Sequence, residues 1–200
     1  MQNKKTNVLT FKDLMPDAQF IQERPRIIQE IIALKRHRRM VLGPHMTVLF
    51  ESRRLVWWQV QEMLRVEKGG AAQAEEELRV YNPLIPSPLR LTATLMIEIA
   101  DPVVREKTLA NLSGLEGYIS LEIDSIRVPA QTVCVDGPPS FSAEVQEGPT
   151  SSVHFLSFSF TQDQKDAFVQ HQPSLVCDHP LYAYSQPLPQ DLWTQLKEDD

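Results

Sequence analysis

Residues 89–99, with the sequence LRLTATLMIEI, decide the fold. Every odd position in this stretch is apolar, and the even positions hold Arg90, Thr92, Thr94, Met96 and Glu98. Strict alternation over eleven residues is typical of a β-strand, because successive side chains of a strand point to opposite faces of its sheet. The stretch therefore predicts a long strand with one buried face.

The flanking sequence predicts further strands and several helices. Strands are expected at residues 47–51, 119–123 and 152–160, with residues 132–135 pairing beside the second of these. Helices are expected at residues 25–39, 55–67 and 71–81, after Asp101-Pro102 up to about Gly114, after Thr161, and at residues 192–197. Half-buried strands are usually antiparallel. The sequence thus predicts an α+β fold.

The predicted organisation is one domain over residues 1–186, followed by a tail at 187–200 with a short helix. The sheet is expected to be mostly antiparallel, packed by the N-terminal and central helices. Residues 137–150 are rich in Pro, Gly and Ser and predict a mobile loop.

Composition and charge narrow the class of protein. The 200 residues are 42% hydrophobic and 23% charged, which is ordinary for a soluble globular protein. No signal peptide or membrane-spanning stretch is evident, so the predicted compartment is the cytoplasm. Two cysteines, Cys134 and Cys177, have no CxxC spacing and are expected to be thiols there. Glycine-rich nucleotide-binding motifs and the common hydrolase motifs are missing.

The net charge of −6 conceals a split between two parts of the chain. Residues 1–68 carry 13 Lys and Arg against 7 Asp and Glu, whereas residues 69–200 carry 7 against 19. This division predicts a polarised surface. The basic run KRHRR at 35–39 lacks interleaved aromatic residues, and the overall pI is about 5.4, so both argue against nucleic acid. An acidic protein surface is a better partner, including the acidic half of a second copy of this chain.

Five side chains are candidates for a catalytic or metal site: His45, Glu51, Glu62, His154 and His179. His45 enters a predicted strand after a turn, and Glu62 comes from the next helix. Histidines with carboxylates could bind zinc, non-haem iron or another divalent metal, or could act as acid and base. None has the close spacing of a known metal motif. The alternative is that His154 belongs to the core, His45 orders a turn and His179 is exposed.

The adjacent Trp57 and Trp58 would project about 100° apart from a helix, so only one of them can be central to the core. The other is expected at the edge of the core or over a ligand. The triplet at 75–77, all glutamate, is expected to form a solvated helix face.

Five blocks carry a family resemblance: GPHMTVLFE (43–51), QVQEMLRVE (59–67), EELRVYNPLIP (76–86), LTATLMIEI (91–99) and TSSVHFLSFSF (150–160). In this order they resemble the bacterial domain-of-unknown-function family DUF3501, over roughly residues 9–184. The blocks include His45, Gln59, Glu62, Asn82, Pro83 and His154, but the family supplies no role for any of them. The resemblance implies an association instead, because members are often encoded beside rubrerythrin and an iron-sulfur oxidoreductase.

Three hypotheses of function follow, and the sequence leaves open whether the protein is an enzyme. The first is a bacterial cytoplasmic accessory or binding protein without catalytic activity, in a redox or oxidative-stress module with those two partners. The second is a metal-dependent or acid/base enzyme that uses His45, Glu62 and His154. The third is a small-molecule sensor that uses Trp57 and Trp58.

Overall fold

The alternating stretch forms strand β3, Arg90–Ile97, which lies inside the sheet between β2, Met46–Phe50, and β6, Val153–Ser159. The computed structural model describes residues 8–133 and 148–198. The described strands form one eight-stranded sheet in the order β1-β2-β3-β6-β5-β4-β7-β8, and every neighbouring pair is antiparallel. The other bounds are β1 Arg39–Leu42, β4 Ile119–Ile123, β5 Ile126–Thr132, β7 Ser174–His179 and β8 Tyr182–Pro187. The predicted α+β class is confirmed.

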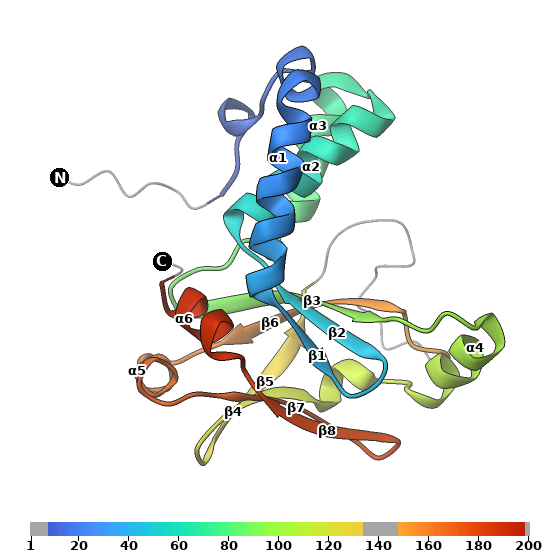
Figure 1. Cartoon of the computed structure of the whole chain (residues 1–200), viewed down its shortest axis with the longest axis vertical. Coiled ribbons are helices and arrows are strands. Elements are labelled where there is room, and N and C mark those ends of the chain that lie inside the picture. The colour runs from blue at the N-terminus through green and yellow to red at the C-terminus, as the bar shows by residue number, and fades with distance from the viewer. Residues whose placement is uncertain (1–7, 134–147, 199–200) are drawn as a thin grey trace.

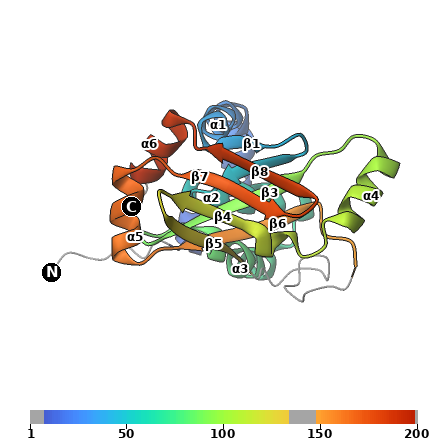
Figure 2. The same cartoon turned by 90° about the horizontal axis from the view of Figure 1, so that it is seen from below.

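The sheet is so strongly curved that its two edge strands, β1 and β8, lie side by side (Figure 2). The Tyr182 hydroxyl joins them, since it donates to the Leu42 carbonyl oxygen at 2.7 Å and accepts from the backbone N–H groups of His45 and Met46. Gly43, with φ +66°, allows this close approach, because a Cβ there would lie 2.7 Å from the same hydroxyl oxygen. The Tyr182 side chain therefore connects β8 to β1, although no strand ladder joins these two edge strands.

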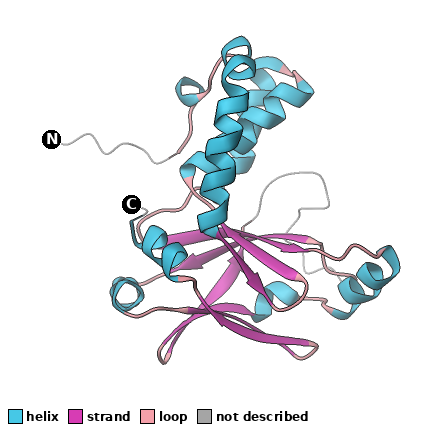
Figure 3. Ribbon diagram, in the orientation of Figure 1, coloured by secondary structure: helices cyan, strands magenta, loops and turns pink. Residues whose placement is uncertain are grey.

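Three helices stand as a bundle on one side of the sheet (Figure 1, Figure 3). They are α1 (Asp17–Arg38), α2 (Arg53–Glu67) and α3 (Gly70–Tyr81). Shorter helices lie at the two ends of the sheet: α4 (Pro102–Asn111) at one, and α5 (Gln162–Gln170) and α6 (Gln190–Glu198) at the other. Single 3-10 turns occur at Phe11–Asp13, Asn82–Leu84 and Leu115–Tyr118.

Several helix ends form as their capping residues predict. Ser52 caps α2, and Asp101 accepts hydrogen bonds from two N–H groups at the start of α4, where Pro102 is the first helical residue. Thr161 and Gln164 form a reciprocal capping box on α5.

The alternation of β3 separates two hydrophobic cores. Leu91, Ala93 and Leu95 point into the core inside the curved sheet, while Met96 packs with the side chains of the helical bundle. The prediction of one buried face for β3 is wrong in part, because the bundle covers the other face as well. Thr92 on that face is only 1% exposed, and its hydroxyl donates to the Leu84 carbonyl oxygen.

The first helix begins earlier than predicted. It starts at Asp17, so Pro25 lies in its interior rather than in its first turn. A proline there cannot donate the hydrogen bond to the preceding turn. The helix continues because Phe20, Ile27 and Ile31 are buried against the core on both sides of the proline. It also ends at Arg38, and Arg39 starts strand β1.

The C-terminal part is more ordered than the sequence predicted. Residues 173–189, for which the sequence predicted no strand, contain the hairpin of β7 and β8. Residues 187–200 were expected to be a tail with a short helix at 192–197; the helix is present as α6, and Leu188, Leu192 and Leu196 belong to the core inside the sheet. The strand beside β4 is β5, which ends at Thr132, rather than residues 132–135. Of the predicted mobile loop, residues 137–147 lie outside the described residues, as does Cys134.

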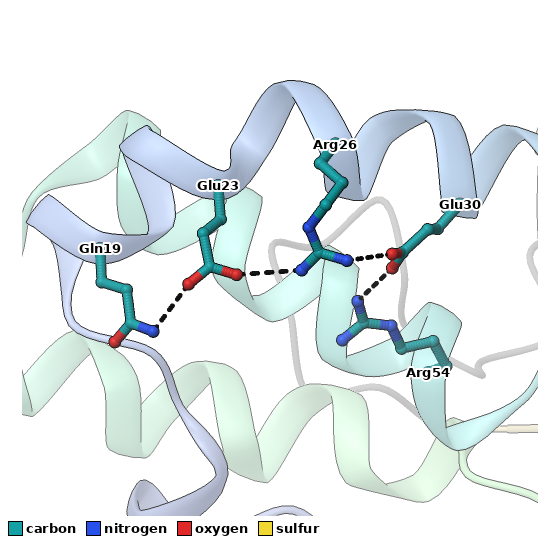
Figure 4. Close-up of polar contacts among 5 residues, drawn as sticks. All are labelled: Gln19, Glu23, Arg26, Glu30 and Arg54. Carbon is teal, nitrogen blue, oxygen red and sulfur yellow. Dashed lines mark hydrogen bonds and ion pairs between the residues drawn. The ribbon is translucent and has the colours of Figure 1, made fainter.

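Many basic side chains of the N-terminal part are engaged in salt bridges. On the outer side of α1, Arg26 bridges Glu23 and Glu30, and Arg54 of α2 also binds Glu30 (Figure 4). Further pairs are Arg24–Glu62, Arg65–Glu62, Arg53–Asp13 and Arg39–Glu98. The positive charge counted in residues 1–68 is thus partly compensated by carboxylates that lie beside it in the fold.

In the described part of the chain, no helix is long and apolar enough to cross a bilayer.

Candidate functional site

The three residues of the predicted enzymatic site lie on different parts of the fold. His45 lies in the turn between β1 and β2, with its ring centroid 6.4 Å from that of Tyr182. Glu62 lies on α2 and forms ion pairs with Arg24 at 2.7 Å and Arg65 at 3.0 Å. His154 lies on β6, where it contacts Thr150 and Ser151 and has Glu116 at 3.8 Å.

The alternation of strand β6 explains why Glu62 and His154 do not meet. His154 pairs with Leu95 across the ladder and lies on the same face as Leu156 and Phe158, which fill the core inside the sheet. Glu62 belongs to the helical bundle on the opposite face. Burial lowers the pKa of His154, which favours its neutral form. Its environment is that of a histidine at the edge of the core.

The wider set of metal candidates does not gather either. In residues 8–133 and 148–198, no three His, Cys, Asp or Glu side chains are grouped as metal ligands would be. His179 is buried rather than exposed, because it packs edge-on against Tyr118 with centroids 4.7 Å apart and its Nδ1 accepts from the Leu181 N–H. His45 lines an open hollow with Tyr182 and Leu181, whereas Glu51 is a buried carboxyl that lines a mostly apolar cavity.

This cavity, called here the Glu51 cavity, lies between the helical bundle and the sheet and has a volume of about 300 Å³. Lys35 of α1, Gln59 of α2, Tyr81 of α3, Thr94 of β3 and Glu51 are its polar residues. Its apolar wall consists of Leu49, Leu55, Val56, Trp58, Leu84, Met96, Val153 and Phe155. Mostly apolar walls with a few convergent polar groups are typical of small-molecule sites.

The ladder register builds the sheet side of the cavity. Leu49 of β2 pairs with Thr94 of β3, and Thr94 pairs with Phe155 of β6, so their side chains form one row on the face toward the helices. Met96 and Val153 form the next such row. Three strands that are distant in sequence thereby supply one wall.

Hydrogen bonds fix both the backbone and the side chain of Glu51. Its N–H donates to the Thr92 carbonyl oxygen at 2.8 Å, and its own carbonyl accepts from the Arg38 guanidinium at 2.6 Å. The Thr94 hydroxyl donates to Glu51 Oε1 at 2.6 Å. Arg38, which belongs to the basic run at 35–39, is thus buried, and it also donates to the Phe50 carbonyl oxygen at 2.9 Å.

Burial raises the pKa of Glu51, against the opposing effects of the Thr94 hydrogen bond and of the charges of Lys35 and Arg38. Glu51 is 9% exposed, and its carboxyl forms no ion pair with the side chains that the structure describes. A buried carboxyl with a raised pKa in a cavity marks a candidate functional site, because titratable groups with shifted pKa values gather at such sites.

Two aromatic residues, Trp58 of α2 and Tyr81 of α3, line the cavity from its helical side. Tyr81 hydrogen-bonds with Gln59, and burial raises the pKa of its phenol. Trp58 is half-buried, whereas its neighbour Trp57 is in the core and donates its indole N–H to the Asp13 carbonyl oxygen. The expectation that only one of the two tryptophans is central to the core is confirmed.

The sequence identified Glu51 as a candidate for a catalytic or metal site rather than as part of an apolar cavity, and it gave no indication of Thr94 or Tyr81. Thr94 stands on the face of the alternating strand that was expected to meet solvent, so nothing local identified it. Glu77, expected on a solvated face, is 8% exposed, and burial raises the pKa of its carboxyl. In both places the helical bundle covers what the sequence suggested was open surface.

The structure therefore defines an α+β protein whose helical bundle covers one face of a curved antiparallel sheet, with a small, mostly apolar cavity between the two. The chain belongs to the family described as "Protein of unknown function (DUF3501)", whose model matches residues 8–199. A solved structure from Burkholderia pseudomallei K96243, described as a novel protein of unknown function, is 30% identical. It matches with a TM-score of 0.87 over 96% of this chain and 98% of its own. None of the curated proteins matches.

Proposed function

We propose that the protein is a cytoplasmic, non-catalytic binding protein that holds a small, largely apolar molecule in the Glu51 cavity. The observation that supports this function is that apolar side chains from α2, the 3-10 turn Asn82–Leu84, β2, β3 and β6 surround one buried carboxyl. Burying a carboxyl costs free energy unless a partner compensates it, and within the described residues its side-chain hydrogen bond comes from Thr94. A ligand with a complementary polar group would supply the remaining compensation.

The binding function can be tested with 1-N-phenylnaphthylamine, an uncharged apolar fluorophore. It is expected to bind with increased fluorescence and to quench the emission of Trp58, so W58F should lose that quenching. Val153→Trp places a bulky ring in the cavity and should abolish dye binding. Val169→Trp is the matched control, because Val169 is 44% exposed on α5 and is not part of the cavity wall. Equal dye binding by both valine variants would refute the cavity as the site.

We further propose that this binding protein serves a redox or oxidative-stress module, with rubrerythrin or an iron-sulfur oxidoreductase as its partner. The support is the gene neighbourhood implied by the family resemblance. Affinity purification of the tagged protein from its native cell, under reducing conditions, is expected to recover one of the two. Recovery of neither, in cells that express both, would count against the module.

A second candidate is an acid/base enzyme, and the observation that favours it is the position of the buried Glu51 carboxyl in the cavity wall, where burial raises its pKa. Its proton-transferring group would then be Glu51 rather than His45, Glu62 and His154. The two functions differ in what happens to a bound molecule. Incubation with a small-molecule extract of the native cell, followed by mass spectrometry, should show compounds retained unchanged by a binding protein. Compounds converted by the wild type and left intact by E51Q would indicate the enzyme.

A further inference from the structure

One oxygen of the Glu51 carboxyl is unpaired among the described residues. Oε1 accepts a hydrogen bond from the Thr94 hydroxyl at 2.6 Å, and no described group donates to Oε2. In the described part of the chain, Ser120 Oγ is the one fully enclosed side-chain oxygen or nitrogen without a partner, so Oε2 is not sealed off by protein atoms. Because Glu51 is buried and lines the cavity, the cavity is the space from which a bound molecule reaches Oε2.

The other polar side chains of the wall already have partners. Thr94 donates its single hydroxyl proton to Glu51. Tyr81 and Gln59 hydrogen-bond with each other. Lys35 is exposed, so water solvates its ammonium. Within the described residues, the wall therefore presents one unpaired oxygen of a buried side chain, which a ligand with a single polar group would match.

A hydroxyl group fits this oxygen whether or not the carboxyl is ionised. A hydroxyl donates one hydrogen bond and also accepts. If Glu51 is ionised, Oε2 is an acceptor and the ligand hydroxyl donates to it. If Oε2 carries a proton, Oε2 donates and the ligand hydroxyl accepts. A group that only donates or only accepts fits one of these two forms alone.

We propose that the ligand of the Glu51 cavity is a small apolar alcohol or phenol. Its hydroxyl hydrogen-bonds with Glu51 Oε2, and its apolar body packs between Trp58 of the bundle and Met96 of the sheet. The cavity volume of about 300 Å³ is at the lower end of the range for ligand pockets, ~300–1,000 Å³, so the molecule is compact. The proposal rests on the proposed binding function and specifies its ligand class.

Charged groups fit this wall less well than a hydroxyl does. An ammonium or a carboxylate would lose its hydration among side chains that are mostly apolar. A carboxylate would also be repelled by Glu51 whenever Glu51 is ionised. An ammonium paired with an ionised Glu51 would have to recover the desolvation of both charges, which buried ion pairs often fail to do. A neutral hydroxyl loses less hydration.

The test uses four molecules with one phenylpropyl skeleton: 3-phenylpropan-1-ol, butylbenzene, 3-phenylpropylamine and 3-phenylpropanoate. Each competes with bound 1-N-phenylnaphthylamine on the full chain at about pH 7. Butylbenzene carries a methyl group in place of the hydroxyl, so the change between variants in the ratio of the alcohol affinity to the butylbenzene affinity isolates the contact of the hydroxyl. On the wild type, the amine and the carboxylate are each expected to bind at least about tenfold more weakly than the alcohol.

Glu51→Leu removes the carboxyl and keeps a branched side chain in its place. This variant is expected to lower the ratio of alcohol to butylbenzene affinity by at least about tenfold, because the ligand hydroxyl is then buried without a partner. E51Q should keep the ratio of the wild type, since an amide both donates and accepts. Glu75→Leu is the matched control, because Glu75 is exposed on α3 and is not part of the cavity wall.

The outcomes distinguish this proposal from the binding function beneath it. If the dye binds but Glu51→Leu keeps the wild-type ratio, or if the alcohol does not displace the dye, the ligand class is wrong and the cavity still binds apolar molecules. The same conclusion follows if the amine or the carboxylate competes as well as the alcohol on the wild type, a measurement that needs no variant to fold. If Val153→Trp leaves dye binding unchanged, the cavity is not the site and both proposals fail.

Discussion

Removal of one hydroxyl group, in Tyr182→Phe, should open the junction between the two edge strands of the sheet. The hydroxyl makes three hydrogen bonds: to the Leu42 carbonyl oxygen at 2.7 Å, from the His45 N–H at 2.9 Å and from the Met46 N–H at 3.2 Å. Leu42 and Met46 are at most 1% exposed, so water does not reach their freed backbone groups without a local opening.

The size of the effect follows from these contacts. A typical hydrogen bond contributes about 1 kcal/mol net, and a buried polar group left without a partner costs about 1–3 kcal/mol. Phenylalanine also avoids the cost of burying a hydroxyl, which offsets part of the loss. We therefore expect Y182F to lower the free energy of unfolding by about 2–4 kcal/mol, a large part of the stability of an ordinary domain.

The matched control is Tyr184→Phe. Tyr184 packs against Tyr182 at a tilt, with ring centroids 4.6 Å apart, but it is 43% exposed, so Y184F should change the free energy of unfolding by no more than about 0.5 kcal/mol. Urea denaturation at pH 7, followed by circular dichroism, gives both free energies, and an unchanged m-value would show that the unfolding transition is the same. Hydrogen exchange at the His45 and Met46 amides should accelerate in Y182F alone.

A result within about 0.5 kcal/mol of the wild type for Y182F, with unchanged exchange at these amides, would refute the reasoning. It would mean that the edge strands are held together by their other contacts.

Three further changes test the charged groups. Burial raises the pKa of Glu51, so the folded state holds the Glu51 proton more tightly than the unfolded state does. The free energy of unfolding of the wild type, relative to that of E51Q, should therefore be greatest below the ordinary pKa of glutamate and should decline as pH rises. Urea titrations between about pH 4 and 8 would measure this difference, and a difference that stays constant with pH would contradict the prediction. Hydrogen bonds from Arg53 and Thr10 lower the pKa of Asp13 to about 2. D13N should therefore lower the free energy of unfolding at pH 7, but by less than about 1 kcal/mol, because the ion pair with Arg53 is partly exposed. That loss should vanish as pH falls through 3.8 toward about 2, whereas persistence at the lower pH would point to a different cause. Arg38→Met should cost about 2–4 kcal/mol in urea denaturation, because two backbone carbonyl groups lose a buried donor; a neutral effect would show that water replaces the guanidinium.

Prediction from the sequence worked where local chemistry sets the structure. The α+β class, β3 and the caps at Ser52, Asp101 and Thr161 follow from alternation and from side chains that bond to their own helix. Prediction failed for β7 and β8, because their prolines and mixed polarity reflect an edge hairpin, of which one strand is mostly exposed. Pro25 suggested a helix start, but contacts made by Phe20 and Ile27 outweigh its local preference.

The candidate site shows the same division. Residue type alone made His45, Glu62 and His154 reasonable candidates, but their convergence depended on which face of the sheet each would take. The structure places His154 on the inner face and Glu62 in the bundle on the other side. Glu51 lay in the initial set, yet its neighbours Lys35, Tyr81 and Thr94 come from elements separated by up to 59 positions in the chain, and no local pattern links them.

The sequence by itself thus determined the period-2 strand that organises the sheet, the helix caps and the class of the fold, because each depends on residues within a few positions of one another. Tertiary structure decided that the polar face of β3 would be covered, that a tyrosine hydroxyl would join the edge strands, and that a carboxyl would be buried in an apolar cavity. The physical reason is that burial arises where distant segments exclude water together, and the face of residues 89–99 that looked open in the sequence became a wall of the candidate site.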